Sequence, residues 1–238
     1  FLTVSGQTLF GPILTSILFL TVISLAIGDQ RADVLGVPYI TFLAPGLIAM
    51  QVIQQSFSHS SSSFMISKIQ GNIVDILYAP LSAIEVTLAI SLAAVTRSVM
   101  IAVISIFVFY LIIDFEIQNY LMLIIFTFLA SFILGNIGII AGLWAEKFDH
   151  MATVTNFVII PLSFLSGTFY TIERLPDFLQ KISLANPFFY MIDGFRFAFI
   201  GQSDGSIMFG ILYLSIISFL SWLLAYYCLL YTSPSPRD

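Results

Sequence analysis

Six long apolar segments occupy most of this 238-residue sequence. Their lengths suit the about 20 residues that an α-helix needs to cross the hydrocarbon core of a bilayer. Only 9% of the residues are charged and 59% are hydrophobic, whereas an ordinary soluble domain has roughly 25% charged residues. Because a water-soluble fold could not cover so much apolar side chain, we expect an all-α integral membrane protein. The expected spans are residues 9–27, 39–57, 85–113, 120–145, 151–170 and 207–227.

Charge and motif content argue against several classes of function. The formal net charge is −5 and no basic run occurs, so nucleic acid is not an expected partner. The sequence has neither the G-x-x-x-x-G-K-[ST] phosphate-binding loop nor the H-E-x-x-H zinc motif. His59 has no His, Cys or carboxylate at ligand spacing, so no metal site is expected. We therefore expect neither a cofactor nor enzymatic chemistry in this chain.

The two ends of the sequence affect the expected domain boundaries. The sequence opens at Phe1 inside an apolar stretch, which indicates a truncated N-terminal portion. Residues 228–238 resemble, codon for codon, the translation of a transposase-type sequencing adapter more than a natural Pro/Ser-rich tail. We therefore expect one transmembrane domain, residues 1–227, and a non-native tail. Cys228 is the single cysteine and falls in that tail, so disulfides are not expected.

Basic residues in the loops leave the orientation open. The positive-inside rule places loops rich in Lys and Arg in the cytoplasm. The loops after the second and fourth spans hold two basic residues, and the loops after the first and fifth spans hold four. Taken literally, this count places the 171–206 loop, which follows the fifth span, in the cytoplasm. The count is incomplete, however, because the basic residues of the missing tails are not included. The residues counted are Lys68 and Lys147, and Arg31, Arg174, Lys181 and Arg196.

Arg97 is a charged residue within the third span. It precedes Ile113 by sixteen residues, which is about 24 Å along a helix, so it lies roughly 6 Å below one surface of a core about 30 Å thick. A snorkelling side chain covers that depth. The expected counter-charge is a lipid phosphate, Glu146 or Asp149, and the alternative is a charge inside a substrate path.

Small residues recur on one face of the fourth span. Spacings of three and four place them in a stripe that lets a second helix approach closely, and residues 138–142 match G-x-x-x-G. We expect helix packing within the chain more than a dimer seam. The stripe consists of Ser131, Gly135, Gly138, Gly142 and Ala145.

Polar residues line one face of the second span. Unsatisfied polar groups are costly in hydrocarbon, so this face must meet protein or water. A wall of a hydrated path and a set of interhelical hydrogen bonds are equally compatible with the pattern. The face carries Gln51, Gln55, Ser58 and Ser62.

Two further segments are amphiphilic and too short to cross the bilayer. Residues 64–82 read as one short amphipathic helix that ends at Pro80 and suits a membrane surface or a partner's groove. In the 171–206 loop, Asp193 and Arg196 have the spacing of a helical ion pair. We expect short re-entrant helices there, either dipping into the outer leaflet or covering a pore mouth. Their aromatic residues, Phe188, Phe189 and Tyr190, are candidate path residues or an interfacial belt.

Four stretches in a fixed order resemble the ABC-2-type permeases, near the polysaccharide and drug exporter branch. The matching stretches are 36–46, 68–82, 142–149 and 186–196. The resemblance implies a multi-pass permease of the bacterial inner membrane with both termini in the cytoplasm, the opposite of the raw Lys and Arg count. It also implies a homodimer on two ATPase subunits, which hold ATP and Mg²⁺.

In that arrangement residues 68–82 form the helix that couples to the ATPase, with residues 146–149 on the same face, and 171–206 is the external re-entrant region. The implied coupling residues are Lys68, Gln70, Gly71, Asn72, Asp75, Leu77, Pro80, Glu146, Lys147 and Asp149. The main alternative is a self-sufficient secondary transporter or channel, which needs charges buried in mid-span, and Arg97 is the single candidate. The sequence does not identify a substrate.

Overall fold

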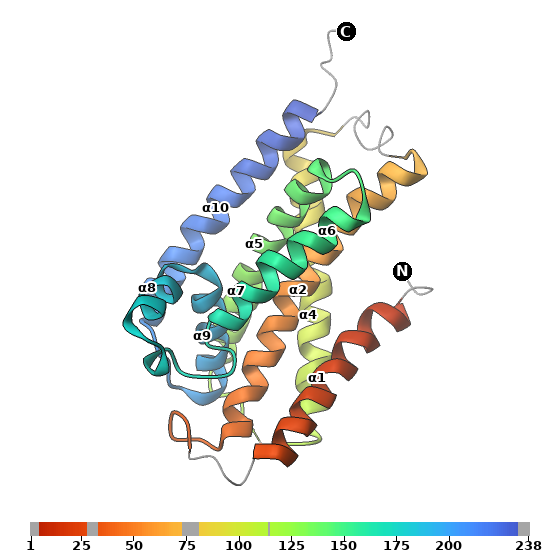
Figure 1. Cartoon of the computed structure of the whole chain (residues 1–238). Coiled ribbons are helices and arrows are strands. Elements are labelled where there is room, and N and C mark those ends of the chain that lie inside the picture. Colours follow the sequence, from red (N-terminus) through yellow and green to blue (C-terminus); the bar gives the residue numbers. More distant parts are fainter. Residues whose placement is uncertain (1–4, 28–32, 73–80, 114, 233–238) are drawn as a thin grey trace.

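The computed structural model describes residues 5–27, 33–72, 81–113 and 115–232. These ranges are nearly all helical, and their β-structure is limited to one isolated bridge, between Val34 and Val37. The all-α class is therefore confirmed (Figure 1). The structure describes the backbone of residues 5–10, 24 and 27 but not their side chains.

Five helices in the described ranges are long and apolar enough to cross a membrane. They are α2 (Tyr39–Gln70), α4 (Ala83–Tyr110), α5 (Tyr120–Trp144), the continuous segment Phe148–Leu165 and α10 (Ile207–Thr232). The first helix, α1 (Ser5–Ile27), contributes a shorter apolar stretch, Gly11–Ile23. The chain is thus a multi-pass membrane protein, and a six-span count stays a prediction.

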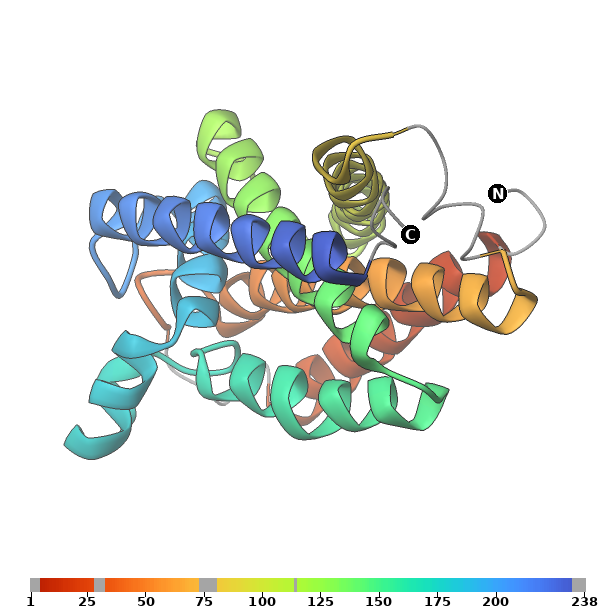
Figure 2. The same cartoon turned by 90° about the horizontal axis from the view of Figure 1, so that it is seen from above.

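The helices are arranged around α2 and α5. In the most apolar window of each helix, 72% of residues are buried for α2 and 67% for α5, but only 17% for α10 and for Phe148–Leu165. Seen from above, α1 and the 148–165 segment lie on one side of α2, with α4 and α10 on the other (Figure 2). The outer helices therefore present apolar side chains to the surroundings, as expected of a protein dissolved in lipid.

The small-residue stripe of α5 packs against α2 of the same chain. A Cβ added to Gly138 would lie 2.7 Å from the Phe57 carbonyl oxygen, and one added to Gly142 would lie 2.9 Å from the Ser61 carbonyl oxygen. At Gly135 the nearest atom would be the Ala94 Cβ of α4, at 3.2 Å. The other members of the stripe, Ser131 and Ala145, are fully buried. Backbone contact of this closeness explains why the sequence has small residues at these positions.

The second span is longer than the sequence suggested. We expected a span at 39–57 and a separate amphipathic helix over 64–82, but α2 continues without a break to Gln70. Its serines bond back to carbonyls one turn earlier, for example Ser61 Oγ to the Phe57 oxygen, so a polar run does not interrupt the helix. Gly71, with φ 77°, ends it. Residues 73–80, including Asp75, Leu77 and Pro80, lie outside the described ranges.

The fifth apolar segment is not one regular α-helix. It consists of α6 (Phe148–Val154), a π turn (Thr155–Ile159) and α7 (Ile160–Leu165). Pro161 lies in the first turn of α7, where a proline has no N–H to offer and its ring crowds the carbonyl four residues earlier. The Ile160 N–H bonds the Thr155 oxygen, five residues back, which widens the turn at this point.

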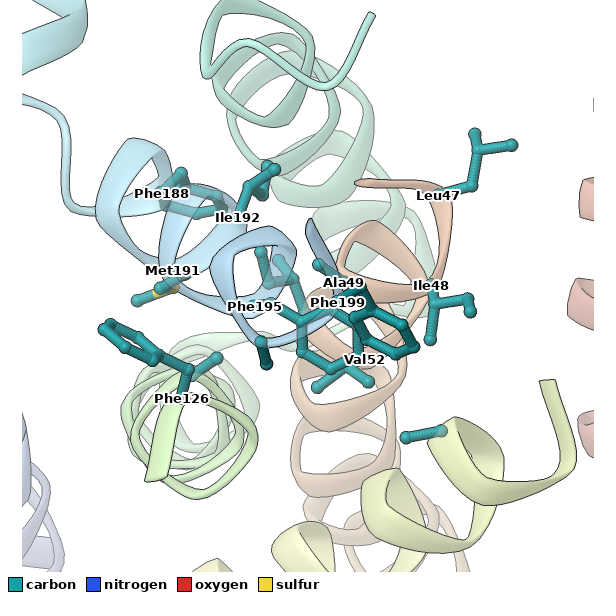
Figure 3. Packing of buried hydrophobic residues seen from close by; sticks show 14 of the residues in the cluster. Leu47, Ile48, Ala49, Val52, Phe126, Phe188, Met191, Ile192, Phe195 and Phe199 are labelled. Atoms are coloured by element: carbon teal, nitrogen blue, oxygen red, sulfur yellow. The ribbon is translucent and has the colours of Figure 1, made fainter. Parts of the chain in front are cut away.

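The region 171–206 contains three short helices, of which one enters the core. A single 3₁₀ turn (Ile172–Arg174) and α8 (Asp177–Ala185) come first, followed by α9 (Pro187–Ile200). Figure 3 shows Phe195 and Phe199 of α9 pointing toward Ala49 and Val52 of α2, with Phe126 of α5 on the other side. The aromatic sequence of α9 thus packs between α2 and α5 rather than covering a surface.

Two ends of the bundle can be distinguished. The C-terminal ends of α2, α5 and α10 lie at one end, which we call the Lys68 end (Figure 1). The N-terminal end of α2, the C-terminal end of α4 and the 201–206 loop lie at the other, which we call the α9 end. The helix α10 continues past Tyr227 to Thr232, through five residues of the segment that the sequence assigned to a non-native tail.

Candidate functional site

A pocket of about 380 Å³ runs along α2 between α1 and α7. Its polar lining consists of amides and hydroxyls, and its apolar lining includes three phenylalanine rings. Two of the four polar positions predicted on α2, Gln51 and Gln55, contribute to it, whereas Ser58 and Ser62 do not. The described lining residues are Pro12, Thr15, Ser16, Phe19, Leu47, Met50, Gln51, Gln54, Gln55, Phe164 and Phe169. We call this pocket the glutamine groove.

Gln51 is a structural member of the groove. Its Nε2 donates to the Pro12 carbonyl oxygen at 2.8 Å and also to Ser16 Oγ, both on α1. Its Oε1 accepts from Ser105 Oγ of α4 at 2.9 Å. With 6% of its surface exposed, this amide has its donors and acceptor occupied and ties three helices together. For Gln51, interhelical hydrogen bonding is therefore the better of the two sequence interpretations.

Gln54 and Gln55 differ from Gln51. Both are half-buried, both line the groove, and within the described ranges neither side chain has a hydrogen-bond partner. An amide facing hydrocarbon without a partner is costly, so these two groups require water or a ligand in the groove. Gln54 was not among the predicted path residues, although its position next to Gln55 on the polar side of α2 was a usable signal.

Aromatic rings close one side of the groove. The ring of Phe169 lies 5.2 Å from that of Phe164 and 5.3 Å from that of Phe19, measured between centroids. These residues come from α7, from the turn after it and from α1, and no pattern in the sequence predicts that these three segments meet. Only the tertiary arrangement of the helices reveals this cluster.

The aromatic residues predicted for the path lie elsewhere. Phe188, Phe189 and Tyr190 are 5%, 1% and 6% exposed and belong to the core. Tyr190 packs edge-on against Phe209 and Tyr213 of α10, with centroids 5.5 and 5.2 Å apart. Within one chain these three side chains therefore line no open surface.

Buried polar groups hold α9 in place. Arg196 lies over the ring of Phe42, at 3.9 Å, and its Nη2 donates to the Gly167 carbonyl oxygen at 2.6 Å. The carboxylate of Asp193 accepts from the backbone N–H groups of Asp204, at 2.9 Å, and Gly205, at 3.0 Å. The bonds of the predicted Asp193–Arg196 pair thus go to two different loops instead of joining the two side chains. Burial raises the pKa of Asp193 to about 6, although Arg196 and the two N–H groups oppose the shift.

The partner of Arg97 differs from the protein partners that the sequence suggested. Its Nη1 lies 3.1 Å from His59 Nδ1 on α2. Since a guanidinium only donates, the imidazole nitrogen is the acceptor. Neither Glu146 nor Asp149 forms an ion pair with it in the described ranges, so that part of the expectation is wrong. His59 had been considered only as a metal ligand.

The Lys68 end joins the last turn of α2 to the end of α5. Lys68 Nζ donates to the carbonyl oxygens of Leu143 and Ala145, the latter at 2.8 Å. This bond brings the first predicted coupling residue next to the 145–149 loop. The remaining described members of that set, Gln70, Gly71, Asn72, Glu146, Lys147 and Asp149, are all exposed.

One catalytic-type motif escaped the sequence analysis. Residues 201–205, Gly-Gln-Ser-Asp-Gly, match G-x-S-x-G. A nucleophile elbow needs a strand before the serine and a helix directly after it, whereas this loop follows the helix α9. Ser203 Oγ donates to the Gly205 carbonyl oxygen, 2.8 Å away, so the hydroxyl serves the loop. The match therefore does not indicate a hydrolase.

A multi-pass helical bundle with an uncharged polar groove beside its central helix has the architecture of a membrane permease. Comparison with known proteins agrees: the chain belongs to the ABC-2 type transporter family, whose model matches residues 1–200. The resemblance seen in the sequence is thereby confirmed.

Two kinds of curated relatives are similar over most of the chain. The inner membrane transport permease YadH of Escherichia coli (strain K12) is 31% identical over 221 residues, which is 92% of this chain and 86% of that protein. Nodulation protein J of Sinorhizobium fredii (strain NBRC 101917 / NGR234) is 22% identical over 200 residues, which is 84% of this chain and 76% of that protein.

Proposed function

We propose that the chain is the membrane subunit of an ATP-driven exporter in the bacterial inner membrane. Two copies would enclose the path, both termini would lie in the cytoplasm, and separate ATPase subunits would hold ATP and Mg²⁺. Membership of the ABC-2 family supports the class of transporter, and the name of the YadH relative supports the membrane.

The observation that carries this proposal is the pair of unpartnered amides, Gln54 and Gln55, in the glutamine groove. They make the groove a suitable place for a hydrated path, because amides without a protein partner need water or a polar ligand. The groove opens to the outside of one chain, so a second copy placed over it would complete the enclosure.

Exposed apolar residues beside the groove support such a dimer. Phe157 of the π turn is 78% exposed, and Val158 next to it is 47% exposed. On α1, Leu18 is 57% exposed. Packing of these side chains against a second copy would replace contacts with lipid by tighter contacts with protein.

The Lys68 end supports docking of an ATPase. Beside the exposed coupling residues, Trp144 is 67% and Phe148 is 49% exposed, close to the carboxylate of Glu146. Exposed aromatic side chains among charged ones are typical of interaction surfaces. ATP binding would close the partner subunits and press on residues 68–82, which biases the membrane helices between two arrangements.

The test is co-purification followed by transport. The gene should lie next to one that encodes a P-loop ATPase. The two chains, expressed together, should purify as a complex, and transport in vesicles should need ATP. Gln54→Leu together with Gln55→Leu should reduce transport at least tenfold and leave the complex intact. The matched control is Gln202→Leu, an exposed glutamine outside the groove. Transport driven by an ion gradient without the ATPase would support the secondary transporter instead.

A further inference from the structure

Lys68 makes a tertiary contact at a helix end that needs one. The last four carbonyls of a helix have no partner within the helix, and the helix dipole places negative charge there. In α5, two of these terminal oxygens, those of Leu143 and Ala145, accept from Lys68 Nζ. The donor lies 75 and 77 residues earlier in the chain, so the contact joins two helices instead of stabilising one turn locally.

On the side of this contact that faces the α9 end, α2 and α5 are packed too closely to slide along each other. The added Cβ at Gly138 would lie 2.9 Å from Ser60 Cβ, and the one at Gly142 would lie 2.9 Å from Phe64 Cβ. From Phe57 to Phe64 the backbone of α2 is therefore in close contact with α5. Because packed helices deform little, this pair behaves mechanically as one body while its ends stay joined.

Lys68 also lies in the last turn of α2, which ends at Gln70. Its carbonyl oxygen accepts from the Gly71 N–H at 3.2 Å, which closes the last turn. The chain is described again at Ser82, which caps α4 through the Glu85 backbone N–H. The described chain on either side of residues 73–80 thus consists of the last turn of α2 and the capped first turn of α4.

At its other end, α5 reaches α9. Gly194 of α9 lies against the ring of Phe126 so closely that no side chain fits between them. Gly205, in the loop held by Asp193, would place a Cβ 3.0 Å from the ring of Phe189. A movement of α5 is therefore transmitted to α9 and to the loop at the α9 end.

We propose that Lys68 is a positioning residue that makes α2 and α5 move together when the ATPase displaces the last turn of α2. This inference rests on the proposed function. Without the two hydrogen bonds from Nζ, the end of α2 moves with the ATPase, but α5 and α9 do not move with α2. The Lys68 ammonium is thus required for coupling rather than for binding of the ATPase or for ATP hydrolysis.

The experiment uses the complex with its ATPase in lipid nanodiscs and vesicles. Lys68→Met keeps the length of the side chain and removes its charge and donors, whereas Lys68→Arg keeps both. Lys68→Met should retain the ATPase and hydrolyse ATP within twofold of the parent, but transport per ATP should fall at least tenfold. Lys68→Arg should retain at least half of the parent's transport per ATP. Lys181→Met, an exposed lysine of α8 far from this end, is the control.

A distance measurement tests the mechanical claim directly. Spin labels on exposed positions of α2 and α5, at Ile66 and Trp144, should keep their separation when ATP is added to the parent and change it in Lys68→Met. A changing distance in the parent, or unchanged transport per ATP in Lys68→Met, would overturn the inference. Failure of the proposed function looks different, because the parent chain would then not bind an ATPase at all.

Discussion

At the scale of single residues, the ionisation of the Asp193 carboxyl is subject to two opposing effects. Burial disfavours its ionised form, while Arg196 and the N–H groups of Asp204 and Gly205 favour it, and burial prevails, so the pKa rises from 3.8 to about 6. Nearby Asp204 also has a raised pKa because it is buried. A carboxyl that is harder to ionise in the folded chain binds its proton more strongly there than in the unfolded chain.

The pH dependence of stability follows from this sign. The contribution of Asp193 is fully present below about pH 4 and is lost as the pH rises through about 6. The thermal midpoint in detergent should therefore fall between pH 5 and pH 7 more for the parent than for Asp193→Asn, which cannot ionise. Asp204 is present in both proteins, so the difference reports the ionisation of Asp193 together with its repulsion by Asp204. Equal pH profiles would show that the raised pKa is absent.

Individual side-chain partners were the least predictable feature of the sequence. Neither carboxylate expected beside Arg97 pairs with it in the described ranges, and His59 of α2 lies beside it instead. Asp193 and Arg196 had the spacing of a pair, but each bonds to backbone groups of a different loop. Such choices depend on which loops the fold brings within about 3 Å, and sequence spacing carries no information about that.

At the scale of helices, contact between α2 and α5 depends on the absence of side chains. A methyl group at Gly138 would lie 2.7 Å from a backbone oxygen, which forces the helices apart. Gly138→Ala should therefore cost about 1–3 kcal/mol, although alanine is the better helix former. The matched control is Gly11→Ala, where nothing lies within 4 Å of the added Cβ. Thermal unfolding of both variants in detergent is the measurement, and equal midpoints would contradict the close packing.

Helix positions were predictable wherever apolar length alone decides them. The cores of α2, α4, α5 and α10 lie where the six-span expectation put them. The extension of α2 to Gln70 was not predictable, because serines that bond their own helix look like a polar break in the sequence. For α9, an aromatic sequence with one polar face fits a membrane interface as well as a protein core, and only the packing against Phe126 decides between them.

At the scale of the whole molecule, the glutamine groove is open on one side, and the proposed dimer would close it. Phe157→Ser removes an exposed ring next to the groove, so the dimer should dissociate about tenfold more readily. Leu212→Ser changes a residue of α10 that is 61% exposed on the opposite side and should leave the dimer unchanged. Native mass spectrometry across a dilution series measures both. Equal dissociation of the two variants would place the dimer contact elsewhere.

The π turn at Thr155–Ile159 holds one residue more than an α-helical turn. The extra residue is absorbed within that turn, so it does not add the about 100° by which one residue rotates a regular helix. Deleting a single residue there should therefore restore a regular α-helical turn and leave Phe164 of α7 facing the glutamine groove. The π turn is thus the place where this helix can change its length by one residue with no change in the lining of the groove.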